Sequence, residues 1–377
     1  MKLTDLRFRA RLSLVLFALC VPLAAQQPLL KSHEVNADRS VTFRYYAPTA
    51  KTVTLELDYD HTKIPLTPGP DGVWTLTTGP LAPELHFYAF QVDSTHVLDP
   101  LNAGVDPNVI YLTNEVSVPG SAPQPWDVTD VPHGVLHHHV YRSGVIAALP
   151  NGNEDYYVYT PPGYDPSGTK RYPVLYLLHG WSSNAEAWPH DGQANLILDN
   201  LIAQGRALPM IVVMPLGYGD FTFVAGGFGQ VTQGKLVENS RRFGKALMTE
   251  ILPQVEVSYR VSARREDRAI AGLSMGGDQS LTIGLNHPEA FGWVGGFSAA
   301  VMYDASDEVM AHLDAARPPK LLWIACGTSD GLVAANRSFV AWLSGKGFKP
   351  TAVETPGIHN WPVWRANLVA FAPLLFR

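Results

Sequence analysis

The most informative segment of the chain reads RAIAGLSMGG at residues 268–277. Its first half is a short apolar run that predicts a buried strand, and its second half holds the pattern Gly-x-Ser-x-Gly centred on Ser274. Small residues are needed at both ends of this pattern because the chain turns sharply from strand to helix, and a Cβ atom would clash with neighbouring backbone. The segment therefore predicts a strand–turn–helix unit that exposes the Ser274 hydroxyl at the carboxyl edge of a sheet.

Strand-like runs alternate with amphipathic stretches from Gly134 to the last residue. Such alternation is typical of a mostly parallel, doubly wound sheet with helices on both faces. We therefore predict one α/β domain over residues 134–377. The predicted strands lie at 155–159, 173–178, 210–214, 269–272, 293–297, 321–325 and 351–354, and the predicted helices at 193–204, 235–255, 277–287, 336–346 and 361–375.

Two loops beyond Ser274 supply the partners that a nucleophilic serine requires. A base must take the hydroxyl proton and an acid must orient that base, and in an α/β-hydrolase sheet the chain order is serine, acid, histidine. Asp330 follows the next-to-last predicted strand, and His359, the last histidine of the chain, follows the final one. Asp304 and Asp307 follow a different strand and are weaker candidates for the acid. We predict a catalytic triad of Ser274, Asp330 and His359.

The oxyanion formed by attack on a carbonyl needs two preorganised N–H donors. The first predicted donor is the backbone of Met275, directly after the nucleophile. The second comes from the loop after an earlier buried strand, where residues 174–178 run into His179-Gly180-Trp181. We choose Trp181 N–H as the second donor, because Gly180 lets this loop pass close to the serine.

Residues 26–118 show a different pattern. Short runs of alternating polarity at 41–45, 53–57, 73–76 and 87–92 are separated by turns rich in proline and glycine, with no helical stretch between them. Strands at this spacing predict a small immunoglobulin-like β-sandwich. Residues 119–133 are rich in proline and predict a linker. Trp74 and Tyr46 are interpreted as core residues of the sandwich, with sugar contact as the alternative.

The motifs of the second domain resemble the esterases of the first carbohydrate-esterase family and the related enterochelin and S-formylglutathione hydrolases. The first domain resembles the early-set domain found ahead of some bacterial esterases. Both resemblances rest on short stretches: FRYYAP at 43–48, GVW at 72–74, FYAFQVD at 87–93 and DPLN at 99–102, then YVYTPPGY at 157–164, HG at 179–180, GLSMGG at 272–277, GTSD at 327–330, and HNW at 359–361 with Trp364.

This resemblance implies a serine carboxylic ester hydrolase that acts on feruloyl or acetyl esters of plant polysaccharide, without a cofactor. Aromatic side chains after the later strands are the candidate substrate contacts: Trp361, Trp364 and Phe221. A siderophore lactone or a small acyl ester or thioester remains an alternative substrate, because one fold serves many reactions. A non-catalytic carbohydrate-binding protein on the same scaffold is the alternative of another class.

Charge and cysteine content limit the partners, the cellular location and the metal sites that we expect for this protein. Lysine and arginine total 28 against 34 aspartate and glutamate, with no basic stripe past the first dozen residues, which argues against a nucleic-acid partner. Residues 1–25 are predicted to be a signal peptide of a secreted or periplasmic protein, because a basic start precedes an apolar run over residues 12–23 that is too short for a stable membrane anchor. Cys326 would then be the only cysteine. We expect no metal site, including at His137-His138-His139. The oligomeric state is left open.

Overall fold

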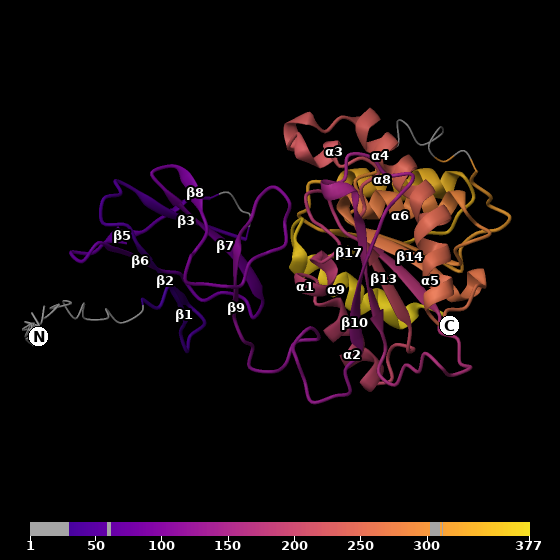
Figure 1. Ribbon diagram of the computed structural model, residues 1–377, viewed down its shortest axis with the longest axis horizontal. Helices are drawn as coiled ribbons and strands as arrows, with labels where there is room; N and C mark the ends of the chain where they lie inside the picture. Colours follow the sequence, from indigo (N-terminus) through magenta and orange to yellow (C-terminus); the bar gives the residue numbers. More distant parts are fainter. Residues whose placement is uncertain (1–29, 59–61, 302–309, 311) are drawn as a thin grey trace, which may run out of the picture.

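The computed structural model describes residues 30–58, 62–301, 310 and 312–377. The predicted signal peptide and the alternative acids Asp304 and Asp307 lie outside the described residues. Within those ranges, no helix has the length and apolar character needed to cross a membrane. Figure 1 shows a β domain in indigo and purple beside a larger domain of helices and strands in magenta to yellow.

The first domain is a sandwich of two antiparallel sheets, as its alternating pattern predicts. One sheet has the strand order β1-β2-β6-β5 and the other β4-β3-β7-β8, with β9 also pairing to β7. The strand bounds are β1 His33–Val35, β2 Val41–Tyr46, β3 Val53–Leu57, β4 Ile64–Pro65, β5 Thr67–Pro68, β6 Val73–Thr77, β7 Leu85–Val92, β8 Thr95–Val97 and β9 Asn114–Ser117. Trp74 lies in the core, as expected, whereas Tyr46 is 58% exposed and the core interpretation was wrong for it.

The second domain is built on an eight-stranded sheet in the order β10-β11-β13-β12-β14-β15-β16-β17. The strands from β12 to β17 run parallel, while β10 and β11 form an antiparallel edge. The mostly parallel sheet of an α/β hydrolase is thereby confirmed. Its strands are β10 Val135–Tyr141, β11 Glu154–Thr160, β12 Val174–Leu178, β13 Ile211–Pro215, β14 Arg268–Leu273, β15 Trp293–Phe297, β16 Leu321–Gly327 and β17 Thr351–Thr355.

Helices cover both faces of this sheet (Figure 1). One apolar core joins the sheet to α4, α5, α6 and α8, and a second core joins the opposite face to α1, α2 and α9. The bounds are α1 Ala187–His190, α2 Ala194–Ala203, α3 Thr222–Ala225, α4 Gln233–Ala246, α5 Leu252–Ser258, α6 Ser274–Asn286, α8 Val333–Gly345 and α9 Trp361–Phe371, with short helical turns at η1 Pro150–Gly152, η2 Phe228–Gln230, η4 Arg265–Asp267 and η6 Ala372–Leu374 and a π segment, η3 Leu247–Ile251.

The two domains pack directly against each other. Phe87 of β7 is buried in the same apolar core as Trp361 at the start of α9. Asn108 Nδ2 donates to Ser182 Oγ across the interface at 2.9 Å. The sandwich therefore forms a wall beside the loops that follow the parallel strands.

Candidate active site

Ser274 lies at the point where β14 ends and α6 begins. Its φ of 51° is left-handed, a strained conformation for a residue with a Cβ. The flanking glycines make the turn sterically allowed: a Cβ on Gly272 would lie 2.5 Å from the carbonyl oxygen of Gly276, and one on Gly276 would lie 2.4 Å from that of His179. The turn places the serine hydroxyl in front of the first turn of α6, where helix N–H groups are unpaired.

The three predicted triad residues meet at the carboxyl edge of the sheet. The distance from Ser274 Oγ to His359 Nε2 is 3.0 Å, and that from His359 Nδ1 to Asp330 Oδ2 is 2.8 Å. Asp330 follows β16 and His359 follows β17, so two parallel neighbouring strands carry both side chains to one edge. An imidazole protonated on Nδ1 donates to Asp330, and its Nε2 is free to accept the serine proton.

Asp330 is held as a carboxylate. Burial raises its pKa, but the hydrogen bond to His359, the charge of His359 and the N–H of Leu332 lower it by more, so the pKa of the Asp330 carboxyl lies below its usual value. Leu332 N–H reaches the second carboxylate oxygen at 2.8 Å. The carboxylate is thus oriented from both sides and stays negative next to the imidazole.

The predicted oxyanion donors belong to two segments that lie near the serine, the start of α6 and the loop after β12. Met275 is the second residue of α6, so its N–H precedes the first intrahelical hydrogen bonds. Trp181 follows Gly180, and a Cβ built on Gly180 would lie 3.4 Å from the Cβ of Ser274. The loop after β12 therefore passes directly over the nucleophile.

His179 fixes the position of that loop. Its Nε2 accepts the N–H of Gly217 at 2.8 Å, and its Nδ1–H donates to the carbonyl oxygen of Gly180 at 2.7 Å. Complete burial lowers the pKa of the imidazole to about 4, so the ring is neutral and both bonds persist at neutral pH. His179 thereby ties the loops after β12 and β13 together; the sequence reasoning quoted it only as part of a motif.

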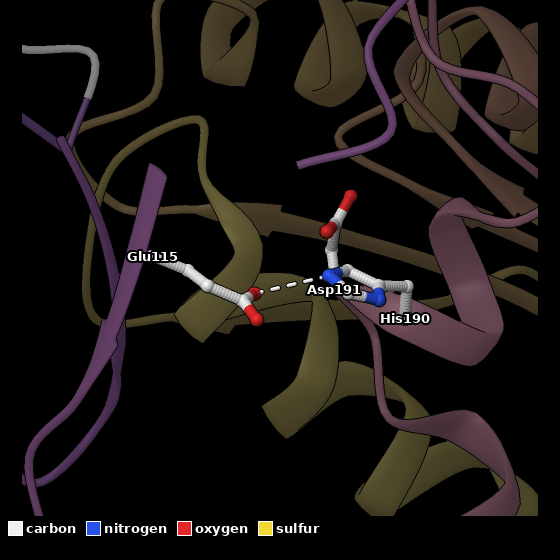
Figure 2. A group of neighbouring side chains, drawn as sticks. All are labelled: Glu115, His190 and Asp191. Carbon is white, nitrogen blue, oxygen red and sulfur yellow. Dashed lines mark hydrogen bonds and ion pairs between the residues drawn. The ribbon is translucent and has the colours of Figure 1, made fainter. Parts of the chain in front are cut away.

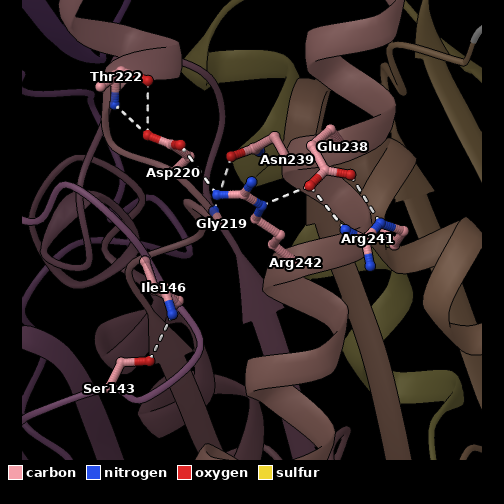
Figure 3. Close-up of polar contacts among 9 residues, drawn as sticks. All are labelled: Ser143, Ile146, Gly219, Asp220, Thr222, Glu238, Asn239, Arg241 and Arg242. Carbon is pink, nitrogen blue, oxygen red and sulfur yellow. Dashed lines mark hydrogen bonds and ion pairs between the residues drawn. The ribbon is translucent and has the colours of Figure 1, made fainter.

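A second polar network holds the chain where it leaves the loop after β13 (Figure 3). Asn239 Oδ1 accepts the N–H of Gly219 at 2.8 Å, and Arg242 Nη1 donates to Asp220 Oδ2 at 3.2 Å. Both partners lie on α4, which is thereby tied to the start of α3. Phe228 lies in η2, between α3 and α4, and its ring packs edge-on against that of Trp181 at 5.3 Å between centroids.

A cleft lies beside the triad, and His359 forms part of its lining. Of the three predicted substrate contacts, Trp361 and Trp364 line this cleft, and Trp364 packs edge-on against the His359 ring at 5.0 Å between centroids. Phe221 does not line this cleft; its ring packs on Tyr218 at 5.6 Å, in the apolar cluster that includes Met275.

The sandwich supplies the opposite wall of the cleft, which the sequence reasoning missed. Five of its residues line the same space: Asp58, Leu85, Phe87, Asp106 and Asn108. Only the docking of one domain on the other brings them near His359, more than 240 positions later in the chain. Neither periodicity nor a motif could have signalled this wall.

Residues 147–375 match the Esterase family model, described as "Putative esterase". The chain belongs to this esterase family. The esterase is accordingly a carboxylic ester hydrolase. Residues 31–109 match "Carbohydrate-binding module 48 (Isoamylase N-terminal domain)", in agreement with the predicted early-set sandwich.

Similar proteins support both assignments. The esterase is 32% identical over 365 residues, 95% of its length, to an "Endo-1,4-beta-xylanase/feruloyl esterase" of Xylanibacter ruminicola, and spans 47% of that relative. It resembles the structure of the CE1 ferulic acid esterase of Anaeromyces mucronatus with a TM-score of 0.58 and 28% identity, over 68% of the esterase and 96% of that chain. An enterobactin esterase of Shigella flexneri shares the fold over 92% of the esterase and 94% of its own chain, with a TM-score of 0.66 and 18% identity. The predicted resemblance to the first carbohydrate-esterase family is confirmed.

Proposed function

We propose that the esterase is a serine hydrolase in which Ser274, His359 and Asp330 cleave a feruloyl or acetyl ester of a plant polysaccharide. The observation that carries this proposal is the hydrogen-bonded chain from Ser274 Oγ through the imidazole to Asp330 Oδ2, at 3.0 and 2.8 Å, beside a cleft lined by His359. Nucleophile, base and orienting acid are thus already within the contact distances that proton transfer needs.

The reaction follows from this geometry in two halves. Ser274 Oγ attacks the ester carbonyl while His359 Nε2 takes the hydroxyl proton, and the N–H groups of Met275 and Trp181 bind the resulting oxyanion. The imidazolium passes its proton to the leaving alcohol, and an acyl-serine remains. Water then attacks this acyl group, His359 takes the water proton and returns it to Ser274, and the acid is released. Asp330 stabilises the imidazolium in both halves, and the chemistry requires no cofactor.

The lining of the cleft favours an aromatic acyl group. Trp181, Trp361 and Trp364 present flat apolar surfaces next to His359, and such surfaces stack on a phenolic ring. The relatives named as feruloyl and ferulic acid esterases support the same substrate class. The signal-peptide pattern of residues 1–25 supports export, which would bring the enzyme to polysaccharide in the periplasm or outside the cell.

The test of the mechanism is Ser274→Ala. We expect turnover of methyl ferulate and of p-nitrophenyl acetate to fall by about 10⁴-fold or more, and labelling by a fluorophosphonate to disappear, while the unfolding temperature stays within a few degrees. Ser344→Ala is the matched control, because Ser344 is an exposed serine on α8 whose hydroxyl donates to the carbonyl of Val340 within the same helix. Undiminished turnover by Ser274→Ala would refute the mechanism, and a wild-type chain that no fluorophosphonate labels would favour the non-catalytic alternative.

The substrate class needs a separate comparison. We expect kcat/KM of the wild type to be higher for methyl ferulate or acetylated xylan than for a catecholate siderophore assayed side by side. A preference for the siderophore would leave the triad mechanism intact and overturn the polysaccharide assignment.

A further inference from the structure

A group of metal-ligating side chains lies where the sandwich meets the hydrolase domain (Figure 2). Glu115 comes from β9 of the sandwich, His190 is the last residue of α1, and Asp191 follows it. Each offers one ligand atom, and the three atoms lie within 4.8 Å of one another. Glu115 Oε2 and His190 Nε2 are 3.0 Å apart. The two halves of this group are 75 residues apart in the sequence, so no ligand spacing could have predicted it.

Within this group, the environment of Asp191 is the evidence for a bound ligand. Its side chain is 1% exposed, and among the described residues neither of its carboxyl oxygens accepts a hydrogen bond from an N–H or hydroxyl group. Leaving such a group buried without a donor is costly, which makes an unpaired carboxylate in a native interior a feature that needs an explanation. Arg365 approaches from α9 and its charge acts on Asp191, but its Nε donates to the backbone oxygen of Asp191 and its Nη1 pairs with Glu84, so neither atom donates to the Asp191 carboxylate.

A further carboxyl group, that of Asp106, lies next to Asp191 and is 3% exposed. Two ionised carboxylates offer only acceptors, so this contact requires either a shared proton or a cation between them. Two carboxylates and one imidazole thus converge on one mostly buried space, with Asp106 beside Asp191.

We propose that Glu115, His190 and Asp191 bind one Zn²⁺ ion. An imidazole together with carboxylates is a donor set for Zn²⁺, whereas Ca²⁺ and Mg²⁺ take oxygen ligands. Glu115 belongs to the sandwich, and His190 and Asp191 belong to the hydrolase domain, so the ion bridges the two domains. Because Asp106 lines the cleft and lies next to Asp191, the ion steadies the wall that the sandwich contributes. Its role is structural and separate from the triad.

The test measures binding directly on the full chain without an affinity tag. Protein stripped with EDTA is dialysed against Zn²⁺, Ca²⁺ or Mg²⁺, and the bound metal and the unfolding temperature are measured. We expect one Zn²⁺ per chain and a higher unfolding temperature with Zn²⁺. Asp191→Asn and Glu115→Gln should each weaken Zn²⁺ binding by at least the ~10-fold that loss of a residue orienting a metal ligand costs. Glu115→Gln keeps the side-chain shape at a half-buried position, so its fold should survive.

Two matched controls address other sources of Zn²⁺ binding. His138→Gln alters the histidine tract on the exposed edge strand β10, and Glu186→Gln removes an exposed acid just before α1. Both variants should bind Zn²⁺ as the wild type does. The proposal is overturned if the stripped chain takes up no stoichiometric Zn²⁺, if Ca²⁺ or Mg²⁺ binds more tightly, or if binding survives Asp191→Asn and Glu115→Gln together. In the first case a shared proton would join Asp106 and Asp191.

Discussion

The side chain of Glu154 is fully buried at the start of β11, and neither carboxyl oxygen has a hydrogen-bond partner in the part of the chain that the structure describes. Burial, followed by the charges of Asp155 and Glu250, raises its pKa to about 10. The folded chain therefore binds this proton more tightly than the unfolded chain, whose carboxyl group titrates near pH 4.5. The contribution of Glu154 to stability is greatest below that pH and is progressively lost as the pH rises toward 10.

Glu154→Gln tests this linkage, because the amide keeps the shape of the protonated acid and does not titrate. We expect the variant to gain stability over the wild type as the pH rises from 5 to 8, by more than about 1 kcal/mol across that interval. Urea unfolding of both proteins at the two pH values measures it. Glu186→Gln, at an exposed position, should show no such gain, and parallel pH dependence of wild type and Glu154→Gln would contradict the assignment of a buried, protonated acid.

A functional residue can be predicted from the sequence when the residues next to it in the chain already indicate its role. Ser274, Asp330 and His359 could be picked from the sequence because each directly follows a strand, and parallel strands deliver their carboxyl ends to one edge of the sheet. Asp191 could not be picked, because its significance comes from partners on another domain. Phe221 was chosen for its aromatic ring alone, and the local turn before α3 directs that ring onto Tyr218.

Among the secondary-structure elements, the strands were the most predictable. Strands buried on both faces read as continuous apolar runs, so β12, β14, β15 and β16 were found within one or two residues of their observed bounds. The start of α6 was predicted near Gly277 but lies at Ser274, because the small residues that follow Ser274 resemble a loop in sequence although they already belong to the helix. The π segment between α4 and α5 packs into the same apolar core as these two helices, so the hydrophobic pattern of the sequence does not distinguish it from them.

The junction of β14 and α6 yields a prediction of its own. In Gly276→Ala the new Cβ would lie 2.4 Å from the carbonyl oxygen of His179 and 2.6 Å from that of Leu178, and both are backbone atoms that the sheet holds in place. We expect a loss of stability of about 2–4 kcal/mol, together with loss of esterase activity, because the turn that presents Ser274 must shift. Thermal unfolding and turnover of methyl ferulate measure the two effects.

Gly345→Ala is the control for this substitution. A Cβ at Gly345, at the exposed end of α8, would meet no atom within 4 Å. The stability and the turnover of Gly345→Ala should match those of the wild type. Wild-type stability of Gly276→Ala would show that the loop after β12 yields more easily than its packing indicates.

At the scale of the whole molecule, the cleft belongs to two domains that the sequence presents as independent. Composition and alternation separated them correctly into a sandwich and an α/β domain, but the docking surface mixes ordinary core residues such as Phe87 with polar loop residues such as Asn108. Neither type of residue indicates in the sequence that it will contact another domain. The joint cleft consequently emerges only once the two folds are placed side by side (Figure 1).

A shared cleft means that the sandwich contributes to substrate choice through contact beside the triad. Leu85 of β7 lines the cleft and is only partly buried, so Leu85→Ala shortens the apolar wall without removing a side-chain hydrogen bond. We expect KM for a feruloylated oligosaccharide to rise by about 10-fold, the lower end of the range for losing a small apolar contact, while turnover of p-nitrophenyl acetate stays unchanged because that substrate is too short to reach the wall. Tyr46→Ala removes the exposed aromatic on β2, outside the cleft lining, and separates this effect from sugar binding elsewhere on the sandwich. If Tyr46→Ala raised KM and Leu85→Ala did not, the sandwich would act through its outer surface rather than through the cleft.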